Sequence, residues 1–218
     1  MKLLLTSDGI TNESIKKALQ DLCVRPFGEL KLAFIPTAAN VEDGDKDWLI
    51  KDISYGMKLG FAETDIVDIS AIDAEMAERR LENADVLMFG GGNTFHLMYW
   101  LQKSGLKQQI PELLKTRVYV GISAGSMVAT ANLVLSDSPR LYNNEKIGAD
   151  ATQGLGLVDF HIRPHLNSLH FPAMSVENVE KISKEVTEPV YAIDDTTAIR
   201  VVDRDMQIIS EGMWKRFN

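Results

Sequence analysis

A serine lies between two glycines in the segment Gly121-Ile122-Ser123-Ala124-Gly125, after an expected strand and before an expected helix. This is the G-x-S-x-G pattern of a nucleophile elbow, in which a sharp strand-to-helix turn exposes the serine hydroxyl above a sheet. The flanking glycines are needed because a Cβ there would collide with the neighbouring strand or helix. We therefore expect Ser123 to be a nucleophile; the structural alternative is a tight turn with an incidental serine.

A serine nucleophile needs a base, and the base needs a carboxylate that orients it. The chain contains four histidines, namely His96, His161, His165 and His170. His165 follows Arg163 and Pro164 at the end of an expected strand, where a base should lie, and the proline would stiffen its approach. We expect His165 to be the base.

Two adjacent carboxylates, Asp194 and Asp195, follow the expected strand at residues 190–193. Either can accept the imidazole N–H, which gives the chain order serine, histidine, acid. In α/β-hydrolases the acid instead precedes the histidine. Three further carboxylates lie between the serine and the histidine in the chain, namely Asp137, Asp150 and Asp159. A serine esterase on the α/β-hydrolase fold therefore stays open as an alternative.

Three consecutive glycines at residues 90–92 follow the apolar run at residues 85–89. Their loop has neither the P-loop spacing nor the G-x-G-x-x-G spacing of nucleotide-binding loops. Two backbone N–H groups from two strand-end loops can form an oxyanion hole, so we expect Gly92 and Ala124 to supply one each. The alternative is a flexible turn capped by Asn93.

Short apolar runs alternate with longer amphipathic stretches along the chain. We expect strands at residues 2–6, 30–36, 63–69, 85–89, 117–122, 157–162, 190–193, 197–202 and 206–210. We expect helices at residues 12–22, 45–59, 71–81, 93–103, 126–133 and 175–186. This alternation predicts one α/β domain over residues 1–218, with a mostly parallel sheet flanked by helices. Ligands of such sheets bind beyond the carboxyl ends of the strands, where the glycine loop and the serine loop lie.

The composition excludes several classes of protein. Lysine and arginine number 23 and aspartate and glutamate 31, a formal net charge of −8, whereas nucleic-acid binding needs a basic face. The single cysteine, Cys23, rules out an internal disulfide and a multi-thiolate metal site, and we expect it to be a small buried hydrophobe on a helix. No apolar run approaches the about 18 residues of a membrane helix, and no targeting segment is visible. We expect a cytoplasmic protein with no nucleic-acid or membrane partner.

Several motifs together resemble peptidase family S51. They are GGGNTFHL at residues 90–97, GISAGSMV at 121–128, RPHL at 163–166 and AIDDTTAI at 192–199. The opening LLLTSDG, the LAFIPTAA strand and the order of all the motifs also match, so the resemblance covers nearly the whole chain. The family comprises aspartyl dipeptidase (peptidase E) and cyanophycinase.

The resemblance implies a fold like that of class I glutamine amidotransferases, with serine in place of their cysteine at the elbow. Family members are cytoplasmic serine hydrolases with a Ser-His-Glu or Ser-His-Asp triad and no metal or other cofactor. Carried onto this sequence, the resemblance makes Ser123 the nucleophile, His165 the base and Asp195 the acid. It gives the oxyanion N–H groups to Gly92 and Ala124.

The resemblance also suggests a substrate. It implies a serine peptidase for small peptides, with Asp-X dipeptides as the first candidates, whereas 218 residues is short for a cyanophycinase. Asp137 matches a short acidic motif that peptidase E has after the elbow helix, and Arg163 and Arg140 are candidate partners for a substrate carboxylate. A non-catalytic small-molecule binding protein on the same fold is the second alternative. A homodimer is left open.

Overall fold

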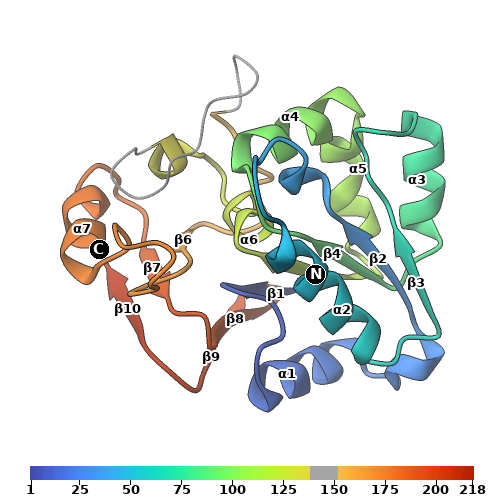
Figure 1. Cartoon of the computed structure of the whole chain (residues 1–218), viewed down its shortest axis with the longest axis horizontal. Coiled ribbons are helices and arrows are strands. Elements are labelled where there is room, and N and C mark those ends of the chain that lie inside the picture. Colours follow the sequence, from blue (N-terminus) through green and yellow to red (C-terminus); the bar gives the residue numbers. More distant parts are fainter. Residues whose placement is uncertain (138–151) are drawn as a thin grey trace.

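A mostly parallel sheet forms the centre of the molecule, which is described here at residues 1–137 and 152–218 of a computed structural model. Its strand order is β3-β2-β4-β5-β1-β8-β9 (Figure 1). The strands are β1 (Lys2–Thr6), β2 (Lys31–Ile35), β3 (Glu63–Ile66), β4 (Val86–Phe89), β5 (Val118–Ile122), β8 (Thr197–Val202) and β9 (Asp205–Ser210). The first five pair in parallel, whereas β8 and β9 continue the sheet beyond β1 in antiparallel pairing.

Helices cover both faces of this sheet, because its strands bury side chains on both sides. One face carries α1 (Glu13–Cys23) and α2 (Asp47–Lys58), and the other carries α3 (Ala74–Glu82), α4 (Thr94–Lys103) and α5 (Leu106–Leu113) (Figure 1). Leu3 and Leu5 of β1 join the core of α4, whereas Leu4 joins the core of α1. Alternate residues of a strand point to opposite faces, so the near-continuous apolar runs fit a sheet covered on both sides.

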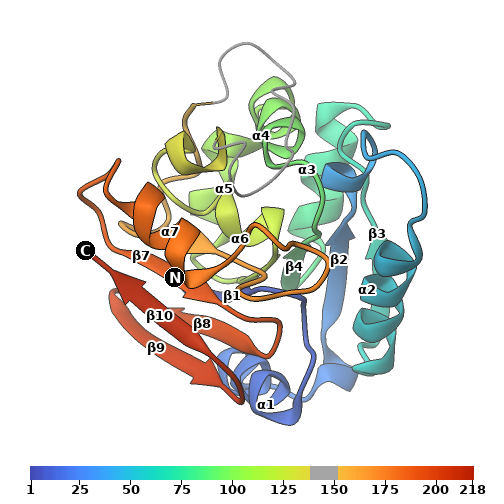
Figure 2. The same ribbon diagram turned by 60° about the vertical axis from the view of Figure 1, so that its left-hand side comes forward.

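A second, smaller sheet lies on the side of β8 and β9 (Figure 2). Its order is β10-β7-β6, formed by β6 (His161–Arg163), β7 (Val190–Ile193) and β10 (Trp214–Phe217). The helix α7 (Val176–Ser183) packs on it around a separate apolar cluster. Since β6 and β7 are parallel, the loops that follow them emerge at one edge.

The predicted fold class, a mostly parallel sheet flanked by helices, is confirmed, but two elements differ from the prediction. The helix expected at residues 126–133 is the short α6 (Ala124–Met127). The backbone after α6 instead pairs with a later segment of the chain. The carbonyls of Val128 and Ala129 accept hydrogen bonds from the N–H groups of Leu155 and Leu157. The strand expected at residues 157–162 shrinks to β6 and belongs to the second sheet.

One α-helix and one strand were missed by the sequence analysis. α5 contains Pro111, which is typical of a helix break. β10 is mostly exposed and charged, so it lacks the apolar pattern of a strand. Residues 138–151 of the stretch expected to be irregular lie outside the described residues. Within the described ranges, no helix is long and apolar enough to cross a membrane. The single domain stays a prediction.

The close approach of α6 to β4 provides a test of the fold. A Cβ on Gly125 would lie 2.1 Å from the carbonyl oxygen of Phe89, which belongs to a fully buried strand. We expect Gly125→Ala to lower the free energy of unfolding by on the order of 2–4 kcal/mol, measured by urea denaturation. Gly28→Ala is the control, because its Cβ would meet nothing closer than 3.8 Å. Equal unfolding midpoints for the two variants would contradict this packing.

Candidate active site

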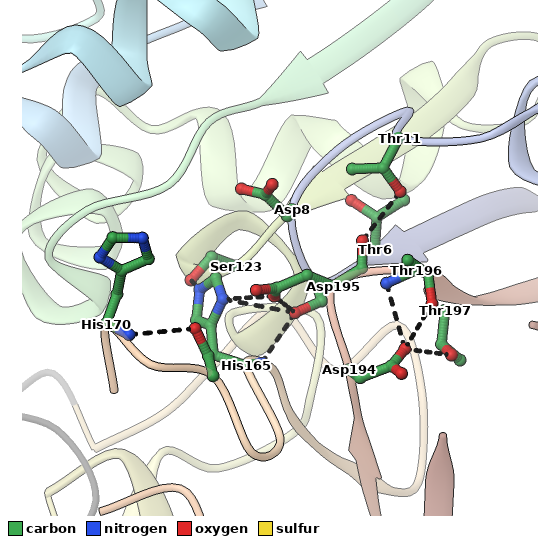
Figure 3. A network of polar contacts seen from close by, with 12 residues as sticks. Thr6, Asp8, Thr11, Ser123, His165, His170, Asp194, Asp195, Thr196 and Thr197 are labelled. Atoms are coloured by element: carbon green, nitrogen blue, oxygen red, sulfur yellow. Dashed lines mark hydrogen bonds and ion pairs between the residues drawn. The ribbon is translucent and has the colours of Figure 1, made fainter. Parts of the chain in front are cut away.

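Loops from both sheets meet at one place. In the central sheet, β4, β5 and β1 are neighbours, so the glycine loop, Ser123 and Ser7 follow the carboxyl ends of adjacent strands. In the second sheet, β6 leads to His165 and β7 leads to Asp195. Figure 3 shows Ser123, His165 and Asp195 side by side, although they come from two different sheets.

Ser123 occupies a strained turn between β5 and α6. Its φ of 47° and ψ of −106° lie in a region that side-chain-bearing residues rarely adopt, and such strain concentrates at functional sites. Its N–H donates to the Thr6 carbonyl at 3.1 Å, and its own carbonyl accepts from the N–H groups of Ser126 and Met127 at 2.9 Å each. These bonds hold the turn that the G-x-S-x-G pattern predicts.

The three polar side chains form a continuous chain of hydrogen bonds. The Nε2 atom of His165 lies 2.9 Å from Ser123 Oγ, and its Nδ1 atom lies 2.7 Å from Asp195 Oδ1. A proton on Nδ1 donates to the carboxylate and leaves Nε2 free to accept from the serine hydroxyl. Phe171 stacks on the imidazole with ring centroids 4.3 Å apart, which fixes the plane of the ring.

The charge of Asp195 is maintained by its hydrogen bonds. Burial favours its protonated form, but hydrogen bonds from His165 and Ser7 outweigh that effect and hold the pKa of this carboxyl below its ordinary value. The acid is therefore ionised at neutral pH and can stabilise a positive charge on the ring.

Ser7 is a residue that the sequence analysis missed. Its buried hydroxyl accepts from the backbone N–H of His165 at 2.7 Å and donates to Asp195 Oδ1 at 2.7 Å. Thr11 adds a hydrogen bond to the Asp195 carbonyl at 2.8 Å. The signal was present in the polar Thr6–Gly9 loop, which follows β1 at the same sheet edge as the elbow.

The neighbouring acid, Asp194, has a different environment. It accepts hydrogen bonds from the backbone N–H of Thr196 at 3.1 Å and from the Thr197 hydroxyl at 2.7 Å, and it also binds the N–H of Met213. Asp194 thus holds the turn between β7 and β8 together (Figure 3). Of the two adjacent carboxylates, the structure brings Asp195 to the imidazole.

Gly92 and Ala124, the two residues expected to donate to an oxyanion, flank the serine. No acceptor within the described ranges pairs with either backbone N–H, and Ala124 begins α6, where the first N–H groups of a helix have no partner inside it. Gly92 has a φ of 123°, and a Cβ there would lie 2.3 Å from the Ala38 carbonyl oxygen. Only glycine fits this position, because the loop packs directly against the backbone of Ala38 and Ala39.

The other candidates lie elsewhere. His96 is buried in α4 and His161 in β6, whereas His170 is exposed and lines the cleft. Cys23 ends α1, and burial raises the pKa of its thiol to about 11, so it is a poor nucleophile. No group of three or more metal-ligating side chains is present in the described part of the chain.

The predicted substrate-binding residues are not brought together. Arg163 is fully buried in β6 and is not among the described residues that line the cleft. Arg140 and Asp150 lie outside the described residues, as does the side chain of Asp137 at the end of the 3₁₀ helix Val134–Asp137. Asp159 is described and exposed. It precedes β6, whereas Asp195 follows β7.

A cleft of about 960 Å³ opens over these side chains. Its walls include Ser123, His165 and Asp195, and also Trp48 and Asp52 of α2. Asp52 is unusual because only 5% of its surface is exposed. Burial, followed by the charge of nearby Asp8, raises the pKa of Asp52 to about 7.

Comparisons with known proteins assign the family. The model of peptidase family S51 matches residues 3–209. An uncharacterised peptidase of Pasteurella multocida is 29% identical over 181 residues, which cover 82% of this chain and 84% of that protein. Peptidase E of a Nostoc species is 29% identical over 185 residues, covering 82% of this chain and 72% of its own.

Solved structures show the same fold. A protein of Listeria monocytogenes assigned to peptidase E superposes with a TM-score of 0.80 at 24% identity, covering 97% of this chain and 98% of its own. A peptidase from an acI-B1 actinobacterium gives 0.71 at 21% identity, covering 98% and 88%. The architecture is the class I glutamine amidotransferase-like fold that the sequence resemblance implies. The chain belongs to peptidase family S51, and it is therefore a peptidase of the serine type.

The burial of Asp52 generates a prediction about stability. Its folded pKa of about 7 lies above the ordinary value of 3.8, so between these values the folded protein holds a proton that the unfolded chain releases, and stability falls as pH rises through that window. Asn has no proton to lose. We expect Asp52→Asn to raise the free energy of unfolding at pH 8.5 by on the order of 2–4 kcal/mol and by much less at pH 5. The melting temperature should rise accordingly at pH 8.5.

Melting curves of the wild type, Asp52→Asn and an exposed control, Asp159→Asn, at both pH values check this expectation. The control should follow the wild type at each pH. If Asp52→Asn changed the melting temperature by the same amount at pH 5 and at pH 8.5, the pKa of Asp52 would not be raised in the folded protein.

Proposed function

We propose that this peptidase hydrolyses small peptides through an acyl-enzyme on Ser123, with His165 as the general base and Asp195 as the acid that orients it. The observation that supports the proposal most strongly is the unbroken chain of contacts, 2.9 Å from Ser123 Oγ to Nε2 and 2.7 Å from Nδ1 to Asp195 Oδ1. A nucleophile hydrogen-bonded to a base, which is in turn hydrogen-bonded to an orienting carboxylate, is the arrangement that acyl transfer needs.

The first half of the reaction forms the acyl-enzyme. His165 Nε2 takes the proton of the Ser123 hydroxyl while Oγ attacks the scissile carbonyl carbon. The carbonyl oxygen becomes an oxyanion, which the N–H groups of Gly92 and Ala124 stabilise. His165 then gives its proton to the leaving amine as the C–N bond breaks, and Asp195 stabilises the positively charged ring between these two transfers.

The second half of the reaction regenerates the enzyme. Water enters where the amine has left, and His165 takes a proton from it as the water oxygen attacks the ester carbon of the acyl-enzyme. The tetrahedral intermediate uses the same two N–H groups. Its collapse returns the proton to Ser123 Oγ and releases the acid product.

Two residues support this machinery without touching the substrate's reacting atoms. Ser7 fixes the backbone of His165 and one oxygen of Asp195 through its two hydrogen bonds, and Phe171 packs flat on the ring. Positioning of this kind matters because a base that is displaced by about 1 Å loses much of its effect.

The volume of the cleft favours a small substrate. A space of about 960 Å³ is within the range of small-molecule sites, roughly 300–1,000 Å³, so a dipeptide or a short peptide fits. A preference for Asp-X dipeptides and a location in the cytoplasm stay predictions of the sequence resemblance.

Removal of the nucleophile is the first test. Ser123→Ala should lower kcat for peptide hydrolysis by on the order of 10⁴-fold or more, because no covalent intermediate can form. Ser14→Ala, an exposed serine on α1, is the matched control and should keep full activity. A serine-reactive phosphonate should label the wild type and the control but not Ser123→Ala. Undiminished hydrolysis by Ser123→Ala would contradict the mechanism, and a wild type that neither hydrolyses nor reacts would favour a non-catalytic binding protein.

The assignment of the acid is tested by isosteric amides. Asp195→Asn keeps the shape of the residue but cannot hold the ring in the required tautomer, so we expect kcat to fall by about 10³–10⁴-fold with a small change in KM. Asp159 is one of the three carboxylates that an α/β-hydrolase order could use, and its side chain is the one that the structure describes. Asp159→Asn should leave kcat within about twofold. The reverse pattern would assign the acid to Asp159.

A further inference from the structure

Helix α2 presents one of its faces to the cleft. Trp48, Lys51 and Asp52 are spaced three and four residues apart, so they share one side of the helix, and all three line the cleft. A Cβ on Gly91 would lie 3.5 Å from the Ser123 Cβ and 3.7 Å from the Trp48 ring. The α2 face is therefore next to the nucleophile.

Asp52 is the buried member of this face, whereas Trp48 is partly buried and Lys51 is exposed. A Cβ on Gly9 would be 3.9 Å from the Asp52 Oδ1 atom and 3.4 Å from the side chain of Ile122, the residue that precedes Ser123. The carboxyl is thus positioned near the elbow, between α2 and the loop that follows β1.

Asp52 has no hydrogen-bond or ion-pair partner in the described part of the chain, although 95% of its surface is buried. The adjacent ammonium of Lys51 instead pairs with Asp8 at 2.7 Å. A buried carboxyl without a partner costs free energy, and departures of this kind from good packing are expected at functional sites. Since Asp52 also lines the cleft, a cationic ligand bound there would supply the missing partner.

We propose that Asp52 binds a cationic group of the substrate, an ammonium or a guanidinium, in the cleft beside Ser123. The inference rests on the proposed function, because it takes the cleft to be the place where a peptide binds. A peptide has two sources of such a group, the free α-ammonium of its first residue and a lysine or arginine side chain.

The charges around the cleft agree with a cation. Seven of the described lining residues are aspartate or glutamate, and Lys51, already paired with Asp8, is the one lysine or arginine among them. Four of these carboxylates lie on the loop before α2 and its first turn, namely Glu42, Asp43, Asp45 and Asp47. A cleft lined by one sign of charge attracts the opposite sign. An acidic substrate side chain would meet repulsion here, so these charges disfavour the Asp-X dipeptides that the sequence resemblance suggests.

The protonation of Asp52 responds to such a ligand in a defined way. Burial and the Asp8 carboxylate, opposed in part by the Lys51 ammonium, raise the pKa of Asp52 to about 7, so the carboxyl of the free enzyme holds a proton up to near neutrality. A bound cation supplies the missing counter-charge and favours the ionised form.

Binding to a catalytically inert protein tests the proposal without requiring turnover. Four peptides are titrated into Ser123→Ala at pH 8 by calorimetry: Leu-Leu, N-acetyl-Lys-Leu, N-acetyl-Asp-Leu and N-acetyl-Leu-Leu. All four share the terminal carboxylate, and they carry respectively an α-ammonium, a side-chain ammonium, an extra carboxylate and none of these. We expect Leu-Leu, N-acetyl-Lys-Leu or both to bind at least tenfold more tightly than N-acetyl-Leu-Leu, and the one that does so identifies the source of the cation.

The same titrations with Ser123→Ala/Asp52→Asn should show no preference for a cation, whereas Ser123→Ala/Asp159→Asn, which removes an exposed charge, should keep it. A preference that survives Asp52→Asn, the absence of any preference, no binding of either cationic peptide, or binding of N-acetyl-Asp-Leu as tight as that of N-acetyl-Lys-Leu would each overturn the proposal. Failure of the proposed function is a separate result, because it is read from hydrolysis by the wild type.

Discussion

The hydroxyl of Ser7 joins the two sheets at the point where the chemistry is expected. It comes from the end of β1 in the central sheet, and its partners, the His165 N–H and the Asp195 carboxylate, come from the ends of β6 and β7 in the second sheet. Ser123 follows a strand of the central sheet, whereas His165 follows a strand of the second sheet. The serine therefore stays within hydrogen-bond distance of its base only if the carboxyl edges of the two sheets remain together. Ser7 provides two hydrogen bonds across that junction.

The site departs from the rules of stable packing in ways that serve a function. Ser123 has a strained backbone, with a φ of 47°, and Asp52 is a buried carboxyl without a partner in the described part of the chain. Each costs stability and is tolerated because the surrounding core fixes it. The strain exposes the hydroxyl of the nucleophile, and the unpaired carboxyl leaves a place for a charged ligand.

Much of this arrangement could be predicted from local patterns. The alternation of apolar runs and helices predicts the parallel sheet, and the glycines around Ser123 predict the turn because of the close contact that Gly125 makes with Phe89. Ser7 and Asp52 could not be found in this way. Their roles depend on contacts with elements more than 40 residues away or on burial, and a serine after a strand or an acid on a helix has no distinctive local pattern.

The central claim is that Ser123 forms a covalent acyl intermediate while His165 and Asp195 control its proton. The most direct measurement is mass spectrometry of the wild-type protein, acid-quenched during turnover of an activated p-nitrophenyl ester of an amino acid. The account predicts a mass increase of one acyl group, located by peptide mapping on Ser123 and absent from Ser123→Ala. Turnover without any acylated protein, or an acyl group on another residue, would contradict it.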